Sequence, residues 1–241
     1  MKAVILAGGK GTRGKPYTEY FPKAMTPIFG KPLIDYIVQY LDTKDLVEEI
    51  IIISDFKGLG GQIKNYYQSP KTKKKISFAQ DSQSGTGGDI LHIEKKLKNQ
   101  PFILWFVDNL CAIDLKKMYK FFKEKKSAAC IATRTRRKEE TGFALVEDGI
   151  IKQFLEKPKL RLSMPECLGI YILGGEIIKK IKSKSNQKEV NLSYDILQEI
   201  SKEGKISSYD IGITPWVDVE SPTTLERKNK EIKQIIKQME L

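Results

Sequence analysis

The sequence predicts a three-layer α/β sandwich, and two patterns support this fold class. Short, wholly apolar runs at residues 3–7, 49–53, 76–79 and 102–107 alternate with segments of helical periodicity, such as residues 33–41. Runs that are apolar throughout are typical of strands buried on both faces of a parallel sheet. We therefore expect a mostly parallel, mixed sheet of Rossmann-like winding with helices on both faces.

The other elements are expected in a simple order. Helical periodicity ends near residue 67, a loop runs from Gln80 to about residue 88, and a helix follows over about 89–97. After residue 127 we expect strands at 128–133, 143–146, 150–155, 167–173 and 206–211, and helices at about 174–182, 192–202 and from Pro222 onward. Asp148-Gly149 between two apolar runs predicts a hairpin. Because no linker or repeat interrupts the chain, we expect one domain, 1–241, with halves at about 1–125 and 126–241.

Composition describes an ordinary globular protein of 241 residues, with 40% hydrophobic and 30% charged residues. No apolar run approaches the roughly 20 residues that cross a bilayer, and no signal peptide precedes the first strand. Cys111, Cys130 and Cys167 lack metal-ligand spacing, so we expect reduced core residues in a cytoplasmic protein without a membrane partner.

The net charge of +12 does not by itself indicate a nucleic-acid partner. The lysines lie in runs such as 71–75 and 123–126 without interleaved aromatic residues, which is typical of solvated faces, and anionic substrates also favour a basic surface. The single histidine, His92, is expected on a solvated helix face. We therefore expect small anionic substrates and no nucleic acid.

A glycine cluster follows the first strand and predicts a polyphosphate site. Gly8, Gly9 and Gly11 allow backbone conformations that expose N–H groups to a concave space, as in known phosphate loops. Arg13 and Lys23 add cations nearby. The dinucleotide fingerprint does not fit because no acidic residue ends a second strand about twenty positions on. A P-loop fits seven positions, but Pro16 replaces the Ser or Thr that ligates magnesium.

A third pattern fits better, because four separate elements occur at consistent spacing. They are L-A-G-G-x-G-T-R, P-x-T, P-K and P-x-x-G-K-P, and they resemble the signature of the sugar-1-phosphate nucleotidylyltransferases, or NDP-sugar pyrophosphorylases. The matching residues are 6–9, 11–13, Pro16, Thr18, Pro22, Lys23, Pro27 and 30–32. The family usually has Leu where this chain has Gly14. The resemblance implies the nucleotide-diphospho-sugar transferase fold and the reaction of an NTP with a sugar-1-phosphate to give an NDP-sugar and pyrophosphate.

The resemblance also implies roles for residues of the first motif. Arg13 and Lys23 would hold the triphosphate and stabilise the leaving pyrophosphate. The remaining nucleotide-binding positions of the motif are Leu6, Ala7, Gly8, Gly9, Gly11 and Thr12.

Two aspartates resemble the family's magnesium ligands. Asp108 follows the strand at 102–107, so we expect it at the carboxyl end of the sheet, where ligands bind in open α/β folds. Asp218 lies in Trp216-Val217-Asp218, which resembles the family's second metal motif. Mg²⁺ takes few protein oxygens and completes its shell with phosphates and water. Val107 stands where the family has glycine.

Four residues of the second half resemble the sugar site. Glu156-Lys157-Pro158 matches the family's E-K-P, in which the glutamate bonds sugar hydroxyls and the lysine binds the sugar phosphate. Gly142 resembles the glycine that lets the sugar approach the backbone, and Gly169 lies in a matching strand motif. Cys167 departs from that motif where a polar residue is usual.

Gln80, together with Gly85 and Thr86, resembles the loop that reads the base in this family. A glutamine offers both a donor and an acceptor to a pyrimidine edge, so dTTP or UTP is favoured, as in the glucose-1-phosphate thymidylyl- and uridylyltransferases. Two alternatives stay open: a GTP-dependent guanylyltransferase, and a non-catalytic subunit that binds nucleotide sugars. A homo-oligomer is possible.

Overall fold

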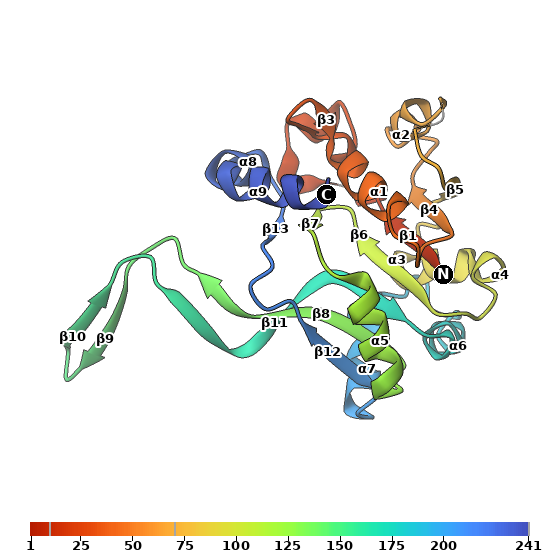
Figure 1. The fold of residues 1–241 in the computed structure, drawn as a ribbon. Helices are drawn as coiled ribbons and strands as arrows, with labels where there is room; N and C mark the ends of the chain where they lie inside the picture. The colour runs from red at the N-terminus through yellow and green to blue at the C-terminus, as the bar shows by residue number, and fades with distance from the viewer. Residues whose placement is uncertain (10, 70, 241) are drawn as a thin grey trace.

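The computed structural model describes residues 1–9, 11–69 and 71–240, and a seven-stranded mixed sheet lies at its centre (Figure 1). The strand order is β12–β8–β11–β6–β1–β4–β5. β11 runs antiparallel to both of its neighbours, and every other pair is parallel. The predicted fold class is thereby confirmed. The strands are β1 (Lys2–Leu6), β4 (Glu49–Ser54), β5 (Lys75–Gln80), β6 (Phe102–Phe106), β8 (Ala129–Lys138), β11 (Lys159–Leu173) and β12 (Ile206–Asp210).

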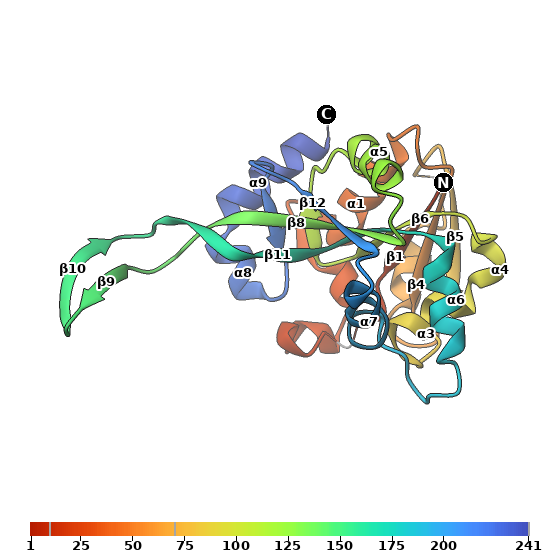
Figure 2. The same ribbon diagram turned by 90° about the horizontal axis from the view of Figure 1, so that it is seen from below.

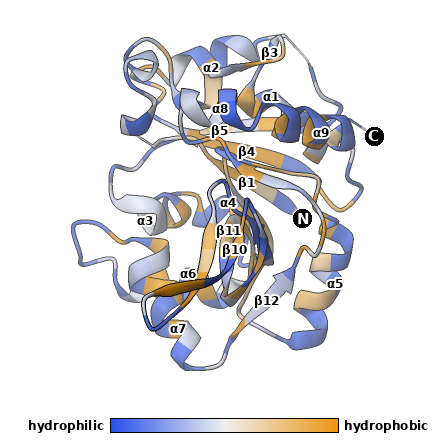
Figure 3. Ribbon diagram, turned by 90° about the vertical axis from the view of Figure 1, so that its left-hand side faces the viewer, coloured by the Kyte–Doolittle hydropathy of each residue, from blue (hydrophilic) through white to orange (hydrophobic). Residues whose placement is uncertain are grey.

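Helices cover both faces because successive residues of each central strand point to opposite sides. In β1, Ala3 and Ile5 face one hydrophobic cluster, and Val4 and Leu6 face another. The first cluster lies under α1 (Leu33–Asp42), α2 (Gly61–Tyr66), α5 (Leu115–Lys125), α8 (Pro222–Arg227) and α9 (Asn229–Met239). The second lies under α3 (Gly85–His92), α4 (Glu94–Leu97), α6 (Gly175–Ser183), the π-helical turn η4 (Leu192–Leu197) and α7 (Gln198–Lys202). Figure 3 shows the central strands as the hydrophobic layer between them.

A long arm leaves the body where β8 and β11 continue past the sheet (Figures 1 and 2). It ends in the hairpin of β9 (Phe143–Glu147) and β10 (Ile150–Leu155). Asp148 and Gly149 both have positive φ, at 49° and 77°, which is the requirement of a type I′ turn. The Asp-Gly signal therefore predicted this hairpin correctly.

Two pairs of short strands complete the architecture. β7 (Asn109–Cys111) pairs with β13 (Trp216–Asp218), and β2 (Pro27–Ile28) pairs with β3 (Lys31–Pro32). Between β1 and β2 the chain forms the 3₁₀ turns η1 (Thr12–Gly14), η2 (Tyr17–Glu19) and η3 (Lys23–Met25). These pieces lie at the carboxyl ends of β1 and β6, so they shape that edge of the sheet.

Several elements differ from the sequence-based expectation. α3 begins at Gly85 and not at residue 89, because the glycines let the chain approach Val190: a Cβ on Gly85 would lie 2.6 Å from the Val190 carbonyl oxygen. The helix expected over 192–202 starts as a π turn, and the last helix is divided at Lys228. α5 was not predicted, although Asp114 caps it by accepting from the Lys117 N–H at 2.9 Å.

Side-chain burial tests the expectations for the cysteines and for His92. Cys111 and Cys130 are buried as expected, whereas Cys167 is exposed, so its assignment to the core was wrong. His92 is exposed at the end of α3, as predicted. Among the described residues, no helix has the length and apolar character that a bilayer crossing needs.

Candidate active site

Two aspartates from distant parts of the sequence meet at the carboxyl edge of the sheet. Asp108 follows β6, and β7 then pairs with β13 so that Asp218 lies opposite Asn109. The Val219 N–H donates to the Asp108 carbonyl oxygen at 2.7 Å, which fixes the two segments together. The Lys23 Nζ lies 2.7 Å from Asp108 Oδ2. The structure therefore brings together Lys23, Asp108 and Asp218, three of the candidate residues named from the sequence.

The electrostatics of this cluster suit a cation. Burial and, secondarily, the neighbouring Asp108 raise the pKa of Asp218 to about 6, despite the opposing effect of Lys23. The Oδ1 atom of Asp218 is buried and has no hydrogen-bond partner among the residues that the structure describes. A buried carboxylate oxygen without a donor is costly unless a metal or another cation satisfies it. The donor set consists of carboxylate oxygens, the ligand type that Mg²⁺ prefers, so these residues fit that ion.

Asn109 connects the three segments that form this edge, and it was not among the predicted residues. Its Nδ2 donates to Asp108 Oδ1 at 2.7 Å. Its Oδ1 accepts from the Trp216 Nε1–H at 2.9 Å and from the Gly169 N–H at 3.2 Å. Asn109 is only 5% exposed, so its side chain is committed to these partners within the protein. The residue orients the Asp108 carboxylate and holds β11 and β13 beside it.

A pocket of about 280 Å³ opens beside the aspartates. Its walls come from β6, β7, β11, β13 and the π turn η4: Phe106, Asp108, Asn109, Glu166, Cys167, Gly169, Tyr171, Ser193, Trp216 and Asp218. Glu166 accepts from Arg134 at 2.6 Å, and that guanidinium lies 4.5 Å from the centre of the Trp216 ring. Of these residues, the sequence had indicated Asp108, Gly169 and Asp218. The π turn, which contributes Ser193 to this pocket, was not predicted from the sequence and is seen only in the structure.

The glycine-rich loop lies at the end of β1 near this edge. Leu6 and Ala7 are buried, and a Cβ on Gly8 would lie 2.1 Å from Asp81 Oδ2, so only glycine lets that carboxylate approach the loop. Among the residues that the structure describes, none would lie within 4 Å of a Cβ on Gly9. Lys10 lies outside the described residues.

The second part of the loop explains one departure from the family pattern. Gly11 has a φ of 58°, and its carbonyl oxygen accepts from the Gly14 N–H and from the Thr18 hydroxyl, both within 2.8 Å. A Cβ on Gly14 would lie 2.6 Å from Thr18 Cγ2, so the leucine usual in the family has no room there. Arg13, in η1, forms an ion pair with Glu220 and is otherwise exposed.

The residues expected to read the base have other partners in the structure. The Gln80 Nε2 donates to Asp55 Oδ1 at 2.8 Å, and its Oε1 accepts from the Phe56 N–H at 3.1 Å. The Thr86 hydroxyl accepts from the Leu192 N–H at 2.9 Å. The segment at Gly85 is thereby joined to the first residue of the π turn. The adjacent Asp81 carboxylate is the group that faces the glycine loop.

The predicted sugar residues fall into two places. Gly169 lines the pocket, whereas Gly142, Glu156 and Lys157 lie on the arm and are not among the lining residues. A Cβ on Gly142 would lie 3.2 Å from Glu156 Oε2, so these two are neighbours. Lys157 has a φ of 48°, and its N–H donates to the Thr141 carbonyl oxygen at 3.3 Å.

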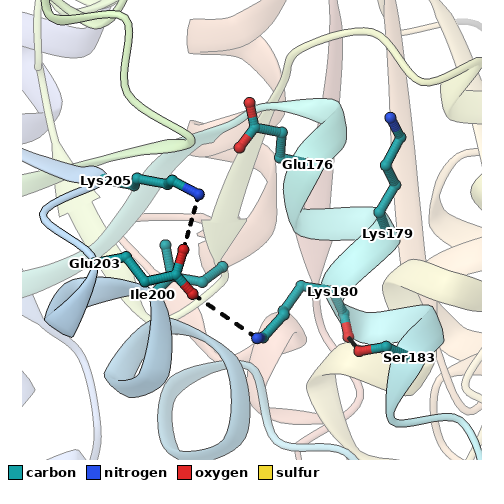
Figure 4. Close-up of a pocket in the computed structure, with 7 residues that line it drawn as sticks. All are labelled: Glu176, Lys179, Lys180, Ser183, Ile200, Glu203 and Lys205. Carbon is teal, nitrogen blue, oxygen red and sulfur yellow. Dashed lines mark hydrogen bonds and ion pairs between the residues drawn. The ribbon is translucent and has the colours of Figure 1, made fainter.

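Another hollow, of about 350 Å³, lies between α6 and α7 and is shown in Figure 4. Lys180 and Lys205 both pair with Glu203 there, at 3.9 Å and 2.8 Å. Lys180, Lys205 and Glu203 therefore form a surface ion-pair network at this hollow.

Comparison with known proteins identifies the class of protein to which this chain belongs. The sequence model described as "Nucleotidyl transferase" matches residues 2–235, so the chain belongs to the nucleotidyl transferase family.

Individual relatives of this chain carry names that differ in the nucleotide and in the sugar phosphate. The chain is 30% identical over 191 residues to mannose-1-phosphate guanylyltransferase 1 of Arabidopsis thaliana, covering 76% of this chain and 52% of that protein. It is 28% identical over 239 residues to a UTP–glucose-1-phosphate uridylyltransferase of Synechocystis, covering 91% of this chain and 60% of the relative. The chain thus spans between half and two thirds of the length of these curated relatives.

A solved structure supports the fold. A UDP-glucose pyrophosphorylase complexed with UDP-glucose superposes with a TM-score of 0.71 at 24% identity, covering 97% of this chain and 98% of the other. The architecture of the sheet and its helices is therefore that of nucleotidyl transferase structures.

Proposed function

We propose that this protein transfers a nucleotidyl group from an NTP to a sugar-1-phosphate and releases pyrophosphate. One observation carries the proposal: Lys23, Asp108 and the partnerless buried oxygen of Asp218 converge beside a glycine-rich loop. Two carboxylates and a cation in this position suit the transfer of a phosphoryl-type group. Membership of the family supports the same reaction class.

The first half, about residues 1–125, would bind the nucleotide. Backbone N–H groups of the loop would bind phosphate oxygens, and Arg13 and Lys23 would neutralise the triphosphate. Arg13 would exchange its ion pair with Glu220 for the substrate. The loop positions involved are Leu6, Ala7, Gly8, Gly9, Gly11 and Thr12.

Asp108 and Asp218 would hold Mg²⁺, which would supply positive charge at the α-phosphate. Asn109 keeps the Asp108 carboxylate oriented through its 2.7 Å hydrogen bond. Lys23, whose Nζ lies 2.7 Å from Asp108 Oδ2, would stabilise charge on the departing pyrophosphate.

The second half, about residues 126–241, would bind the sugar-1-phosphate. Lys157 would orient its phosphate, Glu156 would accept from sugar hydroxyls, and Gly142 and Gly169 would let the sugar approach the backbone. Because three of these residues lie on the arm, their role requires the arm to bend toward the pocket when substrate binds.

The chemistry is a single in-line displacement. An oxygen of the sugar phosphate attacks the α-phosphorus, a new P–O bond forms, and the bond between the α-phosphorus and the bridging oxygen breaks. Both electrons of that bond leave with pyrophosphate. No covalent intermediate with the protein is needed, so positioning and charge neutralisation supply the catalysis.

The identity of the base has two candidates. A pyrimidine triphosphate, dTTP or UTP, is supported by Gln80, whose amide would have to leave Asp55 and Phe56 to read the base. GTP is supported by Asp81, because a carboxylate accepts well from the adjacent N–H donors of guanine, and by the guanylyl relative.

A substrate panel tests the proposal. Pyrophosphate release would be measured with Mg²⁺ for dTTP, UTP, GTP, CTP and ATP, each against glucose-, mannose- and N-acetylglucosamine-1-phosphate. We expect turnover with one pair, and its loss in Asp108→Asn but not in the control Asp114→Asn, which alters the cap of α5 and an exposed ion pair with Lys117. Binding of an NDP-sugar without turnover on any pair would contradict the proposal and support a non-catalytic subunit.

A further inference from the structure

Each of the two cations that the proposed function assigns to the triphosphate is paired with a carboxylate of this chain. The Lys23 Nζ lies 2.7 Å from Asp108 Oδ2, and Arg13 forms an ion pair with Glu220. The first pair belongs to the candidate active site, because Asp108 is also a candidate magnesium ligand. Glu220 is not one of the candidate site residues, so its pairing with Arg13 is a separate feature of the structure.

The backbone is anchored on both sides of Glu220. On one side, the Val219 N–H donates to the Asp108 carbonyl oxygen at 2.7 Å. On the other side, Ser221 is the N-cap of α8, and its hydroxyl accepts from the Thr224 N–H at 3.3 Å. The backbone at Glu220 therefore has a fixed position beside the candidate metal residues, and it presents the carboxylate to Arg13 from there.

Arg13 is carried by a turn whose own hydrogen bonds do not involve Glu220. The Gly11 carbonyl oxygen accepts from the Gly14 N–H at 2.8 Å and from the Thr18 hydroxyl at 2.7 Å. Breaking the ion pair leaves these bonds of the turn intact. The Arg13 side chain is 75% exposed, so its guanidinium can turn from Glu220 to another anion without disturbing a packed core. The pair is thus an exchangeable contact.

A cavity of about 440 Å³ lies between the turns that carry the two cations and the segment that leads into α8. Gly14 and Lys23 line it from the turns, and Glu220 and Glu226 line it from the other segment. The ion pair between Arg13 and Glu220 joins these two walls. A polyphosphate that takes both cations would therefore release the turns from Glu220.

The pair also lies within electrostatic reach of Asp218. Burial is the main reason that the pKa of Asp218 is raised, and the Asp108 carboxylate is the second. Glu220 raises this pKa further, and Arg13 lowers it. The two groups are thus close enough to the candidate metal site to respond to the charge of a substrate bound there.

We propose that Glu220 is an internal competitor of the triphosphate: it holds Arg13 before the NTP binds and recaptures it as pyrophosphate leaves. Glu220 is a positioning residue, because it acts through Arg13 and touches no reacting atom. A competitor of this kind weakens the binding of the NTP and of pyrophosphate by the same factor, so it favours product release. The inference rests on the proposed function for the identity of the anion. Because exposed ion pairs contribute little, we expect a factor of about two to five.

Titration calorimetry with inorganic pyrophosphate and Mg²⁺ measures this competition without any turnover. We expect Glu220→Gln to bind pyrophosphate about two- to fivefold more tightly than the wild type. The matched control is Glu226→Gln, which removes the same charge from the same cavity. Among the described residues, Arg13 pairs with Glu220 and not with Glu226, so the affinity of the control should stay close to that of the wild type. In the Arg13→Gln background, Glu220→Gln should bring little further gain, because the contested cation is gone.

Steady-state kinetics give a second readout on any substrate pair that turns over. Glu220→Gln should lower the KM for the NTP and the inhibition constant of pyrophosphate together, without raising kcat; a folding defect would lower neither constant.

Three results would overturn the inference: equal pyrophosphate affinities in the wild type and Glu220→Gln, an equal gain in Glu226→Gln, or a full gain without Arg13. A protein that turns over no substrate pair, yet binds pyrophosphate more tightly as Glu220→Gln, would support this inference and contradict the proposed catalytic function.

Discussion

Asn109 offers the sharpest test of how the site is held together. Replacing it by alanine removes the acceptor for the Trp216 Nε1–H and the Gly169 N–H, and the donor to Asp108. Each donor left without a partner in a buried position costs about 1–3 kcal/mol. Because Trp216 and Gly169 also line the pocket and can reach water there, we take the lower part of the range. The expected loss in the free energy of unfolding for Asn109→Ala is about 2–4 kcal/mol.

Urea unfolding followed by tryptophan fluorescence measures this loss. The matched control is Asn186→Ala, since Asn186 is exposed and its replacement should change stability by less than about 0.5 kcal/mol. We also expect a lower kcat, because the Asp108 carboxylate loses its orienting donor. A variant as stable as the control would refute the inference that Asn109 joins the three segments.

Three further predictions concern the same edge of the sheet. Lys23→Ala should lower kcat by about two to three orders of magnitude, the usual effect of removing one charge-stabilising donor. The control Lys31→Ala loses an exposed ion pair with Glu240 and a cation–π contact with Tyr36, and it should have little effect on kcat; equal rates in the two variants would remove Lys23 from the mechanism. Mg²⁺ should raise the melting temperature of the wild type but not of Asp218→Asn, because the buried oxygen then lacks the charge that holds the ion; equal shifts would place the ion elsewhere. A thiol reagent should modify Cys167 rapidly in the native protein and the buried Cys111 and Cys130 only on unfolding, with a sugar-1-phosphate protecting Cys167, and its absence from the modified thiols would contradict the pocket geometry.

The fold was predictable because the apolar composition of its strands indicates that they are buried. Residues 49–53 have no polar position after Glu49, so a strand buried on both faces was the only consistent interpretation. α5 was missed because lysines fill most of its solvent face and dilute the apolar period of Leu115, Met118 and Phe122. The early start of α3 could not be predicted, because it depends on contact between Gly85 and Val190, more than a hundred residues away.

A site residue was predictable only where a side chain of suitable chemistry stands at a recognisable position, such as a strand end or a dense motif. Asp108 ends a buried strand, which is a strong local signal, and Lys23 lies in a dense motif. The role of Asn109 arises from partners on β11 and β13, so no local pattern indicates it. Gln80 was expected to be free for a ligand, but the neighbouring Asp55 loop occupies its amide. Which groups compete for a side chain depends on the tertiary structure, and composition and motif spacing do not reveal it.

The pairing of β7 with β13 has a consequence for how the protein matures. It joins residues 109–111 to residues 216–218, so the two acidic groups become neighbours only after a stretch of more than a hundred residues has been made and organised. Contacts of such long sequence separation form slowly because their loop-closure entropy is lost first. During synthesis, the emerging chain would therefore assemble β1, β4, β5 and β6 while Asp218 is still absent. The two aspartates would therefore come together late in folding, when β13, a late segment of the chain, pairs with β7, an early one.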